Sequence, residues 1–404
     1  MVAAVANRAA RALRSAVVLA MLIATPSRAL ADDAGASLTD DRILDAKDET
    51  MGSALRVQSV MTRVTGFDQY GHGFQAQGGP TPMSPGSERL TVFEPEAEIV
   101  ATQGDRITHR VWIPVDVVTN ASPDAVDVLS SASRHVEAGA IDWTTTYRAT
   151  KTIDLSMRNG LHLENPFRSF DSGMAIRRSF ADEATVVSAG ALAVFDWFDR
   201  FNIQGDRRGR TDRSGTTGSL GFTQVLTPTT LASINYGFTV QNGTLGNTWN
   251  SVPLATGGRG PELLPIERMR HALVARAVQW LPWNGALRLY YRLYADDWGI
   301  VAHSVEAQLM QRLTPQLYVG GYYRFHTQTG ASFFTTLAPL DATLRVADSD
   351  LAPLDSETIG GKIVMDFPLR GEIRALHLEL ACERYFRTND LQMNIVSWAT
   401  GFRF

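Results

Sequence analysis

The stretch at 391–404, LQMNIVSWATGFRF, constrains the fold of this chain more than any other. Alternate positions place Trp398, Phe402 and Phe404 on one apolar face, and small or polar residues occupy most positions between them. A repeat of two residues is the repeat of a β-strand, whose successive side chains point to opposite sides. We therefore expect a closing strand here, which pairs with a first strand near 53–66 so that the sheet has no open edge.

The same alternation recurs along the chain and predicts an all-β fold with about sixteen strands. It is clearest at 229–242, where large apolar residues alternate with small or polar ones. It is least distinct at 268–280, because the sequence HALVARAVQWL is also compatible with a helix. The expected strands are 53–66, 88–102, 106–119, 134–147, 152–165, 171–184, 187–201, 214–226, 229–242, 268–280, 284–296, 300–313, 316–329, 355–369, 373–387 and 391–404.

The expected connections between these strands alternate in length. Tight turns follow every second strand, at 104–105, 149–151, 226–228, 281–284, 313–315 and 370–372. Longer connections lie between them, at 68–87, 120–133, 202–213, 243–267 and 330–354. This alternation is typical of a membrane barrel, which has short turns at one end and long loops at the other. A soluble β-sandwich has no reason to sort its connections in this way.

Charged residues on the polar faces of the strands argue against a dry interior, because an unpaired buried ion costs several kcal/mol. In hydrocarbon, every backbone polar group must be paired, so a sheet that spans a bilayer must close on itself. The pattern predicts a transmembrane antiparallel β-barrel with an aqueous lumen. The side chains expected to face this lumen are Glu94, Glu96, Glu98, Arg288, Arg292, Asp296, Glu306, Arg324, His326 and Glu379.

The inward arginines and carboxylates allow two interpretations that do not exclude each other. They can set a transverse field that biases the passage of ions. They can also form ion pairs that only brace the wall. Aromatic residues near the strand ends favour girdles at the two membrane interfaces, although strands are rich in aromatic residues in any case. The girdle candidates are Trp197, Phe198, Trp280, Trp283, Trp298, Tyr385 and Phe386.

The first residues predict secretion. Residues 1–31 combine an arginine-containing start, a short apolar core and a small-x-small cleavage site, which is the pattern of a secretory signal peptide. The acidic segment 32–52 has no strand pattern, and we expect it to be a periplasmic leader before a barrel at 53–404. We therefore expect the protein in the cell outer membrane of a Gram-negative bacterium. Outer-membrane lipid and the barrel-assembly machinery would be its partners.

Other kinds of site find little support in the sequence. The net charge of -4 argues against a nucleic-acid partner. No catalytic, cofactor-binding or zinc motif is present, so we predict no enzyme activity and no cofactor. Asp296 and Asp297 are candidate ligands for Ca²⁺, although a turn stabilised by Asp side chains is the favoured interpretation. The single cysteine, Cys382, excludes an internal disulfide and is expected on the lipid face.

A family resemblance rests mainly on two blocks, YRLYADDWGI at 291–300 and YYRFHTQTGASFF at 322–334. They resemble a bacterial family of unknown function that is treated as a porin-like outer-membrane β-barrel. A weaker block, PDAVDVLSSAS at 123–133, departs from that family, because Ser131 replaces an expected Gly. The resemblance implies an architecture and a location for most of the mature chain. It implies no activity and no catalytic residues.

These observations favour a porin-like barrel whose polar lumen passes small solutes. Two alternatives from other classes remain open. One is a barrel enzyme that acts on lipid or peptide at the membrane rim, and the other is a structural or docking barrel with a plugged lumen. The sequence leaves the oligomeric state and the identity of any solute open.

Overall fold

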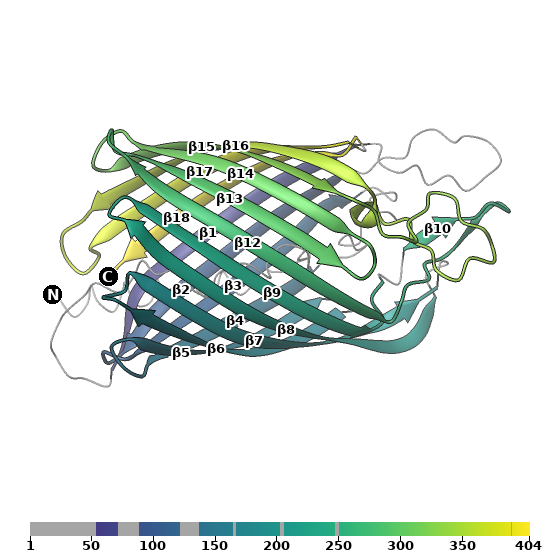
Figure 1. The fold of residues 1–404 in the computed structure, drawn as a ribbon, viewed down its shortest axis with the longest axis horizontal. Coiled ribbons are helices and arrows are strands. Elements are labelled where there is room, and N and C mark those ends of the chain that lie inside the picture. Colours follow the sequence, from purple (N-terminus) through teal and green to yellow (C-terminus); the bar gives the residue numbers. More distant parts are fainter. Residues whose placement is uncertain are drawn as a thin grey trace, which may run out of the picture.

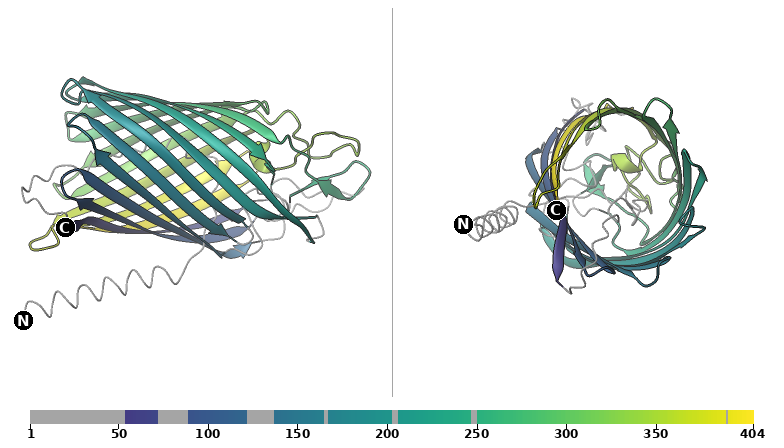
Figure 2. Two further views of the ribbon diagram at one scale, coloured as in Figure 1. Left: turned by 90° about the horizontal axis from the view of Figure 1, so that it is seen from below. Right: turned by 90° about the vertical axis from the view of Figure 1, so that its left-hand side faces the viewer.

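The computed structural model describes residues 54–71, 89–121, 137–164, 167–202, 206–246, 250–388 and 390–404. The expected signal peptide and leader lie outside these residues. Within them, sixteen antiparallel strands form one closed barrel, whose strands cross the wall at a tilt (Figure 1). Seen end-on, the strands form a ring (Figure 2). The predicted all-β, sixteen-strand architecture is confirmed.

The strands of the wall follow the order of the sequence. They are β1 (Leu55–Tyr70), β2 (Leu90–Gln103), β3 (Ile107–Ala121), β4 (Glu137–Arg148), β5 (Ile153–Glu164), β6 (Phe167–Phe180), β7 (Thr185–Phe201), β8 (Arg207–Thr227), β9 (Thr230–Gly243), β12 (Glu267–Leu281), β13 (Gly285–Asp296), β14 (Val301–Arg312), β15 (Leu317–Gln328), β16 (Leu354–Pro368), β17 (Ala375–Arg387) and β18 (Gln392–Arg403). Outside the wall, β10 (Ser251–Pro253) and β11 (Arg259–Pro261) form a small sheet, and η1 (Ser349–Leu351) is a short 3-10 helix. The ambiguous segment at 268–280 is therefore a strand.

The barrel closes where β18 pairs with β1. The register runs from Ser59 opposite Arg403 to Tyr70 opposite Gln392. Beyond this ladder, the backbone N–H of Phe404 donates to the carbonyl oxygen of Gln58 at 2.9 Å. The expected pairing of the first and last strands is thus confirmed, and it removes the open edges that a sheet would otherwise expose.

The largest departures from the expected boundaries are those of β6 and β8. β6 spans Phe167–Phe180 rather than 171–184, because the four residues before 171 continue its alternation and a turn begins at Ala181. The connection between β5 and β6 is consequently short, and the expected alternation of loop lengths fails at this point. β8 begins at Arg207 rather than at 214. Its first residue pairs with β7, where the Arg207 guanidinium donates to Asp199 at 2.7 Å.

Alternation sorts the wall into two faces. Apolar side chains point outward, as shown by Ile234, which is 53% exposed, and Trp398, which is 46% exposed. The opposite face carries many charged and polar side chains and lines a central cavity of about 2160 Å³. A ring of sixteen strands is too wide for its side chains to fill, so a cavity follows from the strand number.

The girdle candidates divide between these two faces. Two are exposed on the outer face, Trp197 and Phe386, and two more, Trp280 and Trp283, are exposed beside the turn that joins β12 to β13. Three line the cavity, which contradicts the expectation for them: Phe198, Tyr385 and Trp298. Adjacent residues of a strand point to opposite sides, so neither 197 and 198 nor 385 and 386 can share a face.

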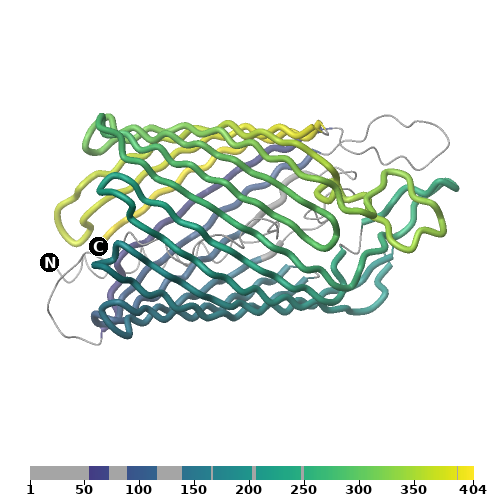
Figure 3. The backbone as a smooth tube through the Cα atoms, in the orientation of Figure 1, coloured from purple at the N-terminus to yellow at the C-terminus, as the bar shows by residue number. Residues whose placement is uncertain are grey.

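Two connections pack against each other at the end of the barrel away from the C-terminus (Figure 3). One joins β9 to β12 and the other joins β15 to β16. Isolated bridges pair Leu254 with Ala338 and Leu263 with Arg345. The buried Arg345 side chain donates to the carbonyl oxygens of Pro261 and Leu340 at 3.0 and 3.3 Å. We call these two connections the rim loops. Within the described ranges, no helix is long and apolar enough to cross a membrane.

Candidate functional site

Arginines dominate the inner face of β12 and β13. Even-numbered residues of both strands point inward, and the cavity is lined by five of their arginines: Arg268, Arg270, Arg276, Arg288 and Arg292. On the inner faces of these two strands, both described in full, Asp296 is the one acidic residue. The two strands therefore carry an excess of positive charge toward the cavity. We call this surface the arginine wall.

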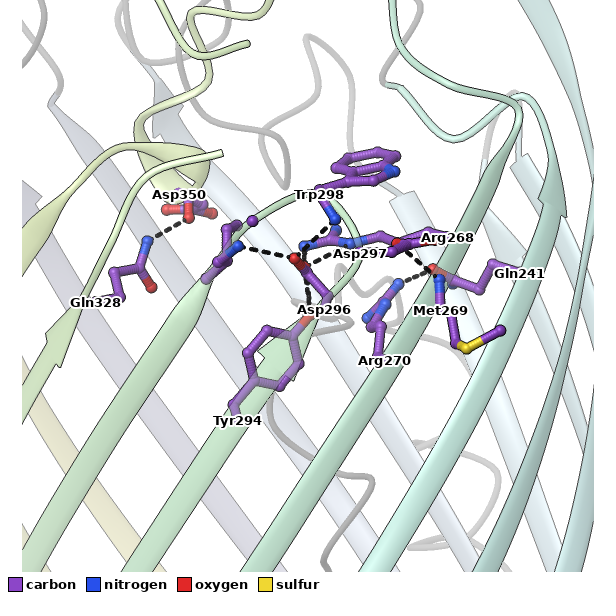
Figure 4. A network of polar contacts seen from close by, with 12 residues as sticks. Gln241, Arg268, Met269, Arg270, Tyr294, Asp296, Asp297, Trp298, Gln328 and Asp350 are labelled. Atoms are coloured by element: carbon purple, nitrogen blue, oxygen red, sulfur yellow. Dashed lines mark hydrogen bonds and ion pairs between the residues drawn. The ribbon is translucent and has the colours of Figure 1, made fainter. Parts of the chain in front are cut away.

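Asp296 lies at the end of this wall nearest the rim loops, which we call the loop end, and its side chain is completely buried (Figure 4). Its Oδ2 accepts from the Arg268 Nε at 3.0 Å and from the Tyr294 hydroxyl at 2.8 Å. Its Oδ1 accepts from the backbone N–H groups of Trp298 and Ile300 at 3.1 and 2.9 Å. Both carboxylate oxygens are thus used within the protein, where they fix the turn between β13 and β14.

Asp297 and Trp298 complete this turn. The Asp297 Oδ1 accepts from the backbone N–H of Met269 at 2.9 Å, which ties the turn to β12. The Trp298 indole donates to the carbonyl oxygen of Glu267 at 3.0 Å, and the Arg268 guanidinium lies 4.2 Å from the centre of its ring. These contacts match a turn held by Asp side chains. Among the described residues, no three His, Cys, Asp or Glu side chains gather in a way that could hold a metal ion.

Trp298 is only 3% exposed and packs against the rim loops. It forms a small apolar core with Ile300 and Ala331, and its ring meets that of Phe333 edge-on at 5.3 Å. This packing explains why the tryptophan points inward rather than toward an interface. The turn therefore anchors a rim loop to the arginine wall.

Arg270 has a different environment from Arg268, its neighbour on the same face. It donates to the Gln241 side-chain oxygen on β9, which is a neutral partner. Its Nε is buried and has no hydrogen-bond partner in the part of the chain that the structure describes. Figure 4 shows Arg270 beside the cluster formed by Arg268, Tyr294 and Asp296.

The acidic residues expected in the lumen lie mostly in ion pairs. Glu96 accepts from Arg63 at 3.1 Å, and Glu98 pairs with Arg110 at 2.6 Å. Glu379 lies 3.7 Å from the second terminal nitrogen of Arg63. Glu94 shares the inner face of β2 with the other two glutamates, because it precedes them by steps of two residues.

The remaining expected lumen residues form short links between neighbouring strands. Arg324 pairs with Glu306 at 2.7 Å. Arg288 donates to Gln308 at 3.2 Å. His326 has the Ser304 hydroxyl 2.8 Å from its Nδ1. Arg292 also lines the cavity, directly opposite Ser304 in the strand register.

Sequence reasoning missed three members of the arginine wall: Arg268, Arg270 and Arg276. The segment that holds them was compatible with a helix, and a helix would have spread these residues over different faces. A usable signal was present, because all three arginines occupy even positions. Once the segment is known to be a strand, this parity places them on a single face.

Comparison with solved structures gives distant similarities. A "Bacterial polysaccharide outer membrane secretin" is 8% identical, with a TM-score of 0.44, and covers 85% of this chain and 98% of its own. A BenF-like porin from Pseudomonas fluorescens Pf-5 is 9% identical, with a TM-score of 0.44, and covers 86% and 99%. OpdQ of Pseudomonas aeruginosa is 8% identical, with a TM-score of 0.42, and covers 86% and 97%. No curated protein matches this chain.

A family model matches residues 135–395, which include both blocks that carry the resemblance. Its description is "Protein of unknown function (DUF3570)". The match spans more than half of the chain, and the chain accordingly belongs to the DUF3570 family of proteins of unknown function.

Proposed function

We propose that this protein is a porin-like barrel of the outer membrane of a Gram-negative bacterium and passes small hydrophilic solutes through its lumen. The observation that carries the proposal is the contrast between the two faces of the wall. The outer face is apolar and exposed, whereas the inner face is charged and surrounds a cavity of about 2160 Å³.

The outer face supports a membrane location. Large apolar residues such as Leu289, Val305 and Leu309 are exposed on neighbouring strands of the wall. A continuous apolar surface of this kind is unfavourable in water and rare in monomeric soluble proteins. In hydrocarbon it is favourable, and the closed ladder leaves no backbone edge unpaired. Outer-membrane lipid and the barrel-assembly machinery remain the proposed partners.

The charge distribution of the inner face supports a role in moving solutes. In the ring, seven strands separate β2 from β12 in either direction, so the two lie opposite each other. Glu94, Glu96 and Glu98 lie on the inner face of β2, and the arginine wall lies across from them. Opposed charges of this kind produce a transverse field, which affects the passage of ions. The ion pairs of Glu96 and Glu98 also brace the wall, so the two interpretations coexist.

Electrical recording in planar bilayers tests this proposal. Purified protein, shown to be folded by its heat-modifiable migration in gels, should give stepwise increases in conductance. Detergent alone and heat-unfolded protein serve as controls. A folded preparation that inserts into the bilayer without conductance steps would favour a plugged barrel instead.

A further inference from the structure

We infer that Arg270 forms a binding site for small oxyanions, such as carboxylates and phosphate, near the loop end of the lumen. This inference rests on the proposed channel function, because the ligand must reach a side chain that faces the cavity. Arg270 lines that cavity, as do Arg213 on β8 and Arg268 on β12.

The first argument is the balance of charge around Arg270. Arg268 pairs with Asp296, and Arg213 pairs with Asp196. Asp296 is the register partner of Arg270 across the two strands, yet its carboxylate oxygens are occupied by Arg268, Tyr294 and the backbone of the turn. Three arginines therefore share two carboxylates, and one positive charge remains at Arg270.

The second argument is the hydrogen bonding of Arg270. A guanidinium has five N–H donors, and the side chain uses Gln241 as its acceptor. Its buried Nε has no partner among the described residues. A buried donor without a partner is costly, and so is a buried charge that has no carboxylate in direct contact. An oxyanion would supply both an acceptor for the Nε and a negative charge, because two of its oxygens match the planar fork of the guanidinium.

The third argument is the position of Arg270 along the arginine wall. Arg270 lies near the start of β12, and Arg276 lies six residues farther from the loop end on the same face. Arg292 and Arg288 lie on the neighbouring strand, opposite Val274 and Val278. An anion held at Arg270 thus has further guanidinium groups along the same side of the cavity. Weak sites in series allow an ion to bind and still leave.

Equilibrium binding and bilayer recording test the inference together, with inorganic phosphate and acetate as probes. Calorimetry of the detergent-solubilised barrel should detect phosphate binding, and Arg270→Gln should weaken it by about tenfold or more, because bonds to a charged group are lost. Arg270→Lys keeps the charge but loses the fork, so an intermediate affinity is expected. In bilayers, phosphate added on the loop side should reduce chloride current in the wild type and much less in Arg270→Gln.

Arg110→Gln is the matched control, since it also removes one inward positive charge. Arg110 lies on β3, beside the glutamates of β2 and across the lumen from the arginine wall. This variant should leave phosphate affinity within about twofold of the wild type. Equal weakening by both variants would show a general charge effect and overturn the inference. Unchanged binding in Arg270→Gln would also overturn it. Phosphate binding without any conductance would refute the channel but support the site, so the two proposals fail separately.

Discussion

The Arg387 guanidinium on β17 donates to the Asp350 carboxylate of η1 at 2.9 Å. Arg387 is buried, with 4% of its side chain exposed, whereas Asp350 lies in the rim loop between β15 and β16. The contact therefore ties a rim loop to a strand of the wall. Gln328 adds a second tie, because its side-chain nitrogen donates to the backbone carbonyls of Asp350 and Ala352 at 2.9 and 2.7 Å.

Loosening this tie should free the rim loop without unfolding the barrel. Asp350→Ala removes the carboxylate that offsets the charge of the buried Arg387. We expect this loss to lower the free energy of unfolding by roughly 1–3 kcal/mol. Limited proteolysis of the folded protein should then cut faster within 329–353. Asp341→Ala, which alters an exposed residue of the same loop, is the control. Equal cleavage rates in both variants would show that the tie does not hold the loop.

The two faces of β9 should respond differently to charge. Ile234 points outward and Ser233 points to the lumen. Ile234→Arg should lower the free energy of unfolding by roughly 2–4 kcal/mol if the residue lies near the bilayer midplane, because the guanidinium enters hydrocarbon. Ser233→Arg should cost much less, since its side chain meets water. Reversible unfolding in lipid vesicles gives both values. Similar losses would indicate that this strand is covered on both sides.

The glycines of β16 should also differ from each other. A Cβ at Gly360 would lie 2.3 Å from a ring carbon of Tyr322, whereas at Gly361 the nearest atom is a backbone oxygen at 3.4 Å. Gly360→Ala should therefore displace the tyrosine ring and destabilise the barrel by about 1–3 kcal/mol through overpacking. Gly361→Ala should have a small effect. Thermal unfolding followed by gel mobility distinguishes them, and equal melting temperatures would refute the close packing of Tyr322.

The register between β1 and β18, whose pairing we call the seam of the barrel, predicts which pairs of introduced cysteines can cross-link. Thr65 is the register partner of Ser397, whereas Ala399 pairs with Arg63. In a Cys382→Ser background, Thr65→Cys with Ser397→Cys should oxidise to a disulfide in the folded protein. The combination of Thr65→Cys with Ala399→Cys should form a disulfide far less readily, because the Cβ atoms of this diagonal pair are farther apart. Preferential linkage of the second pair would mean a shifted register.

Alternation was enough to predict the wall, because one apolar and one polar face repeat in strand after strand. It gave the closing strand with Trp398 outward, and it led to the expectation that Arg288 and Arg292 face inward. Alternation could not show which carboxylate pairs with which arginine. That choice depends on the register between strands and on the turn that directs Asp296 toward Arg268 rather than Arg270, and alternation within one strand does not contain this information.

The rim loops were beyond prediction for a related reason. Their contacts join residues far apart in sequence, such as Leu263 and Arg345. A short-range sequence pattern cannot predict such a pair. Trp298 shows the same limit. Its position at a strand end suggested an interface, but its surroundings are set by Phe333, which comes from a different connection.

The seam also determines when the wall can be completed during folding. Thr62 donates to the carbonyl oxygen of Thr400, 338 positions later in the chain. Local hairpins can form early, whereas this contact must wait until almost all of the barrel sequence is available. Until then, β1 and the most recently added strand each present an unpaired edge, which invites pairing with other chains. The growing sheet therefore needs protection of those two edges until β18 arrives.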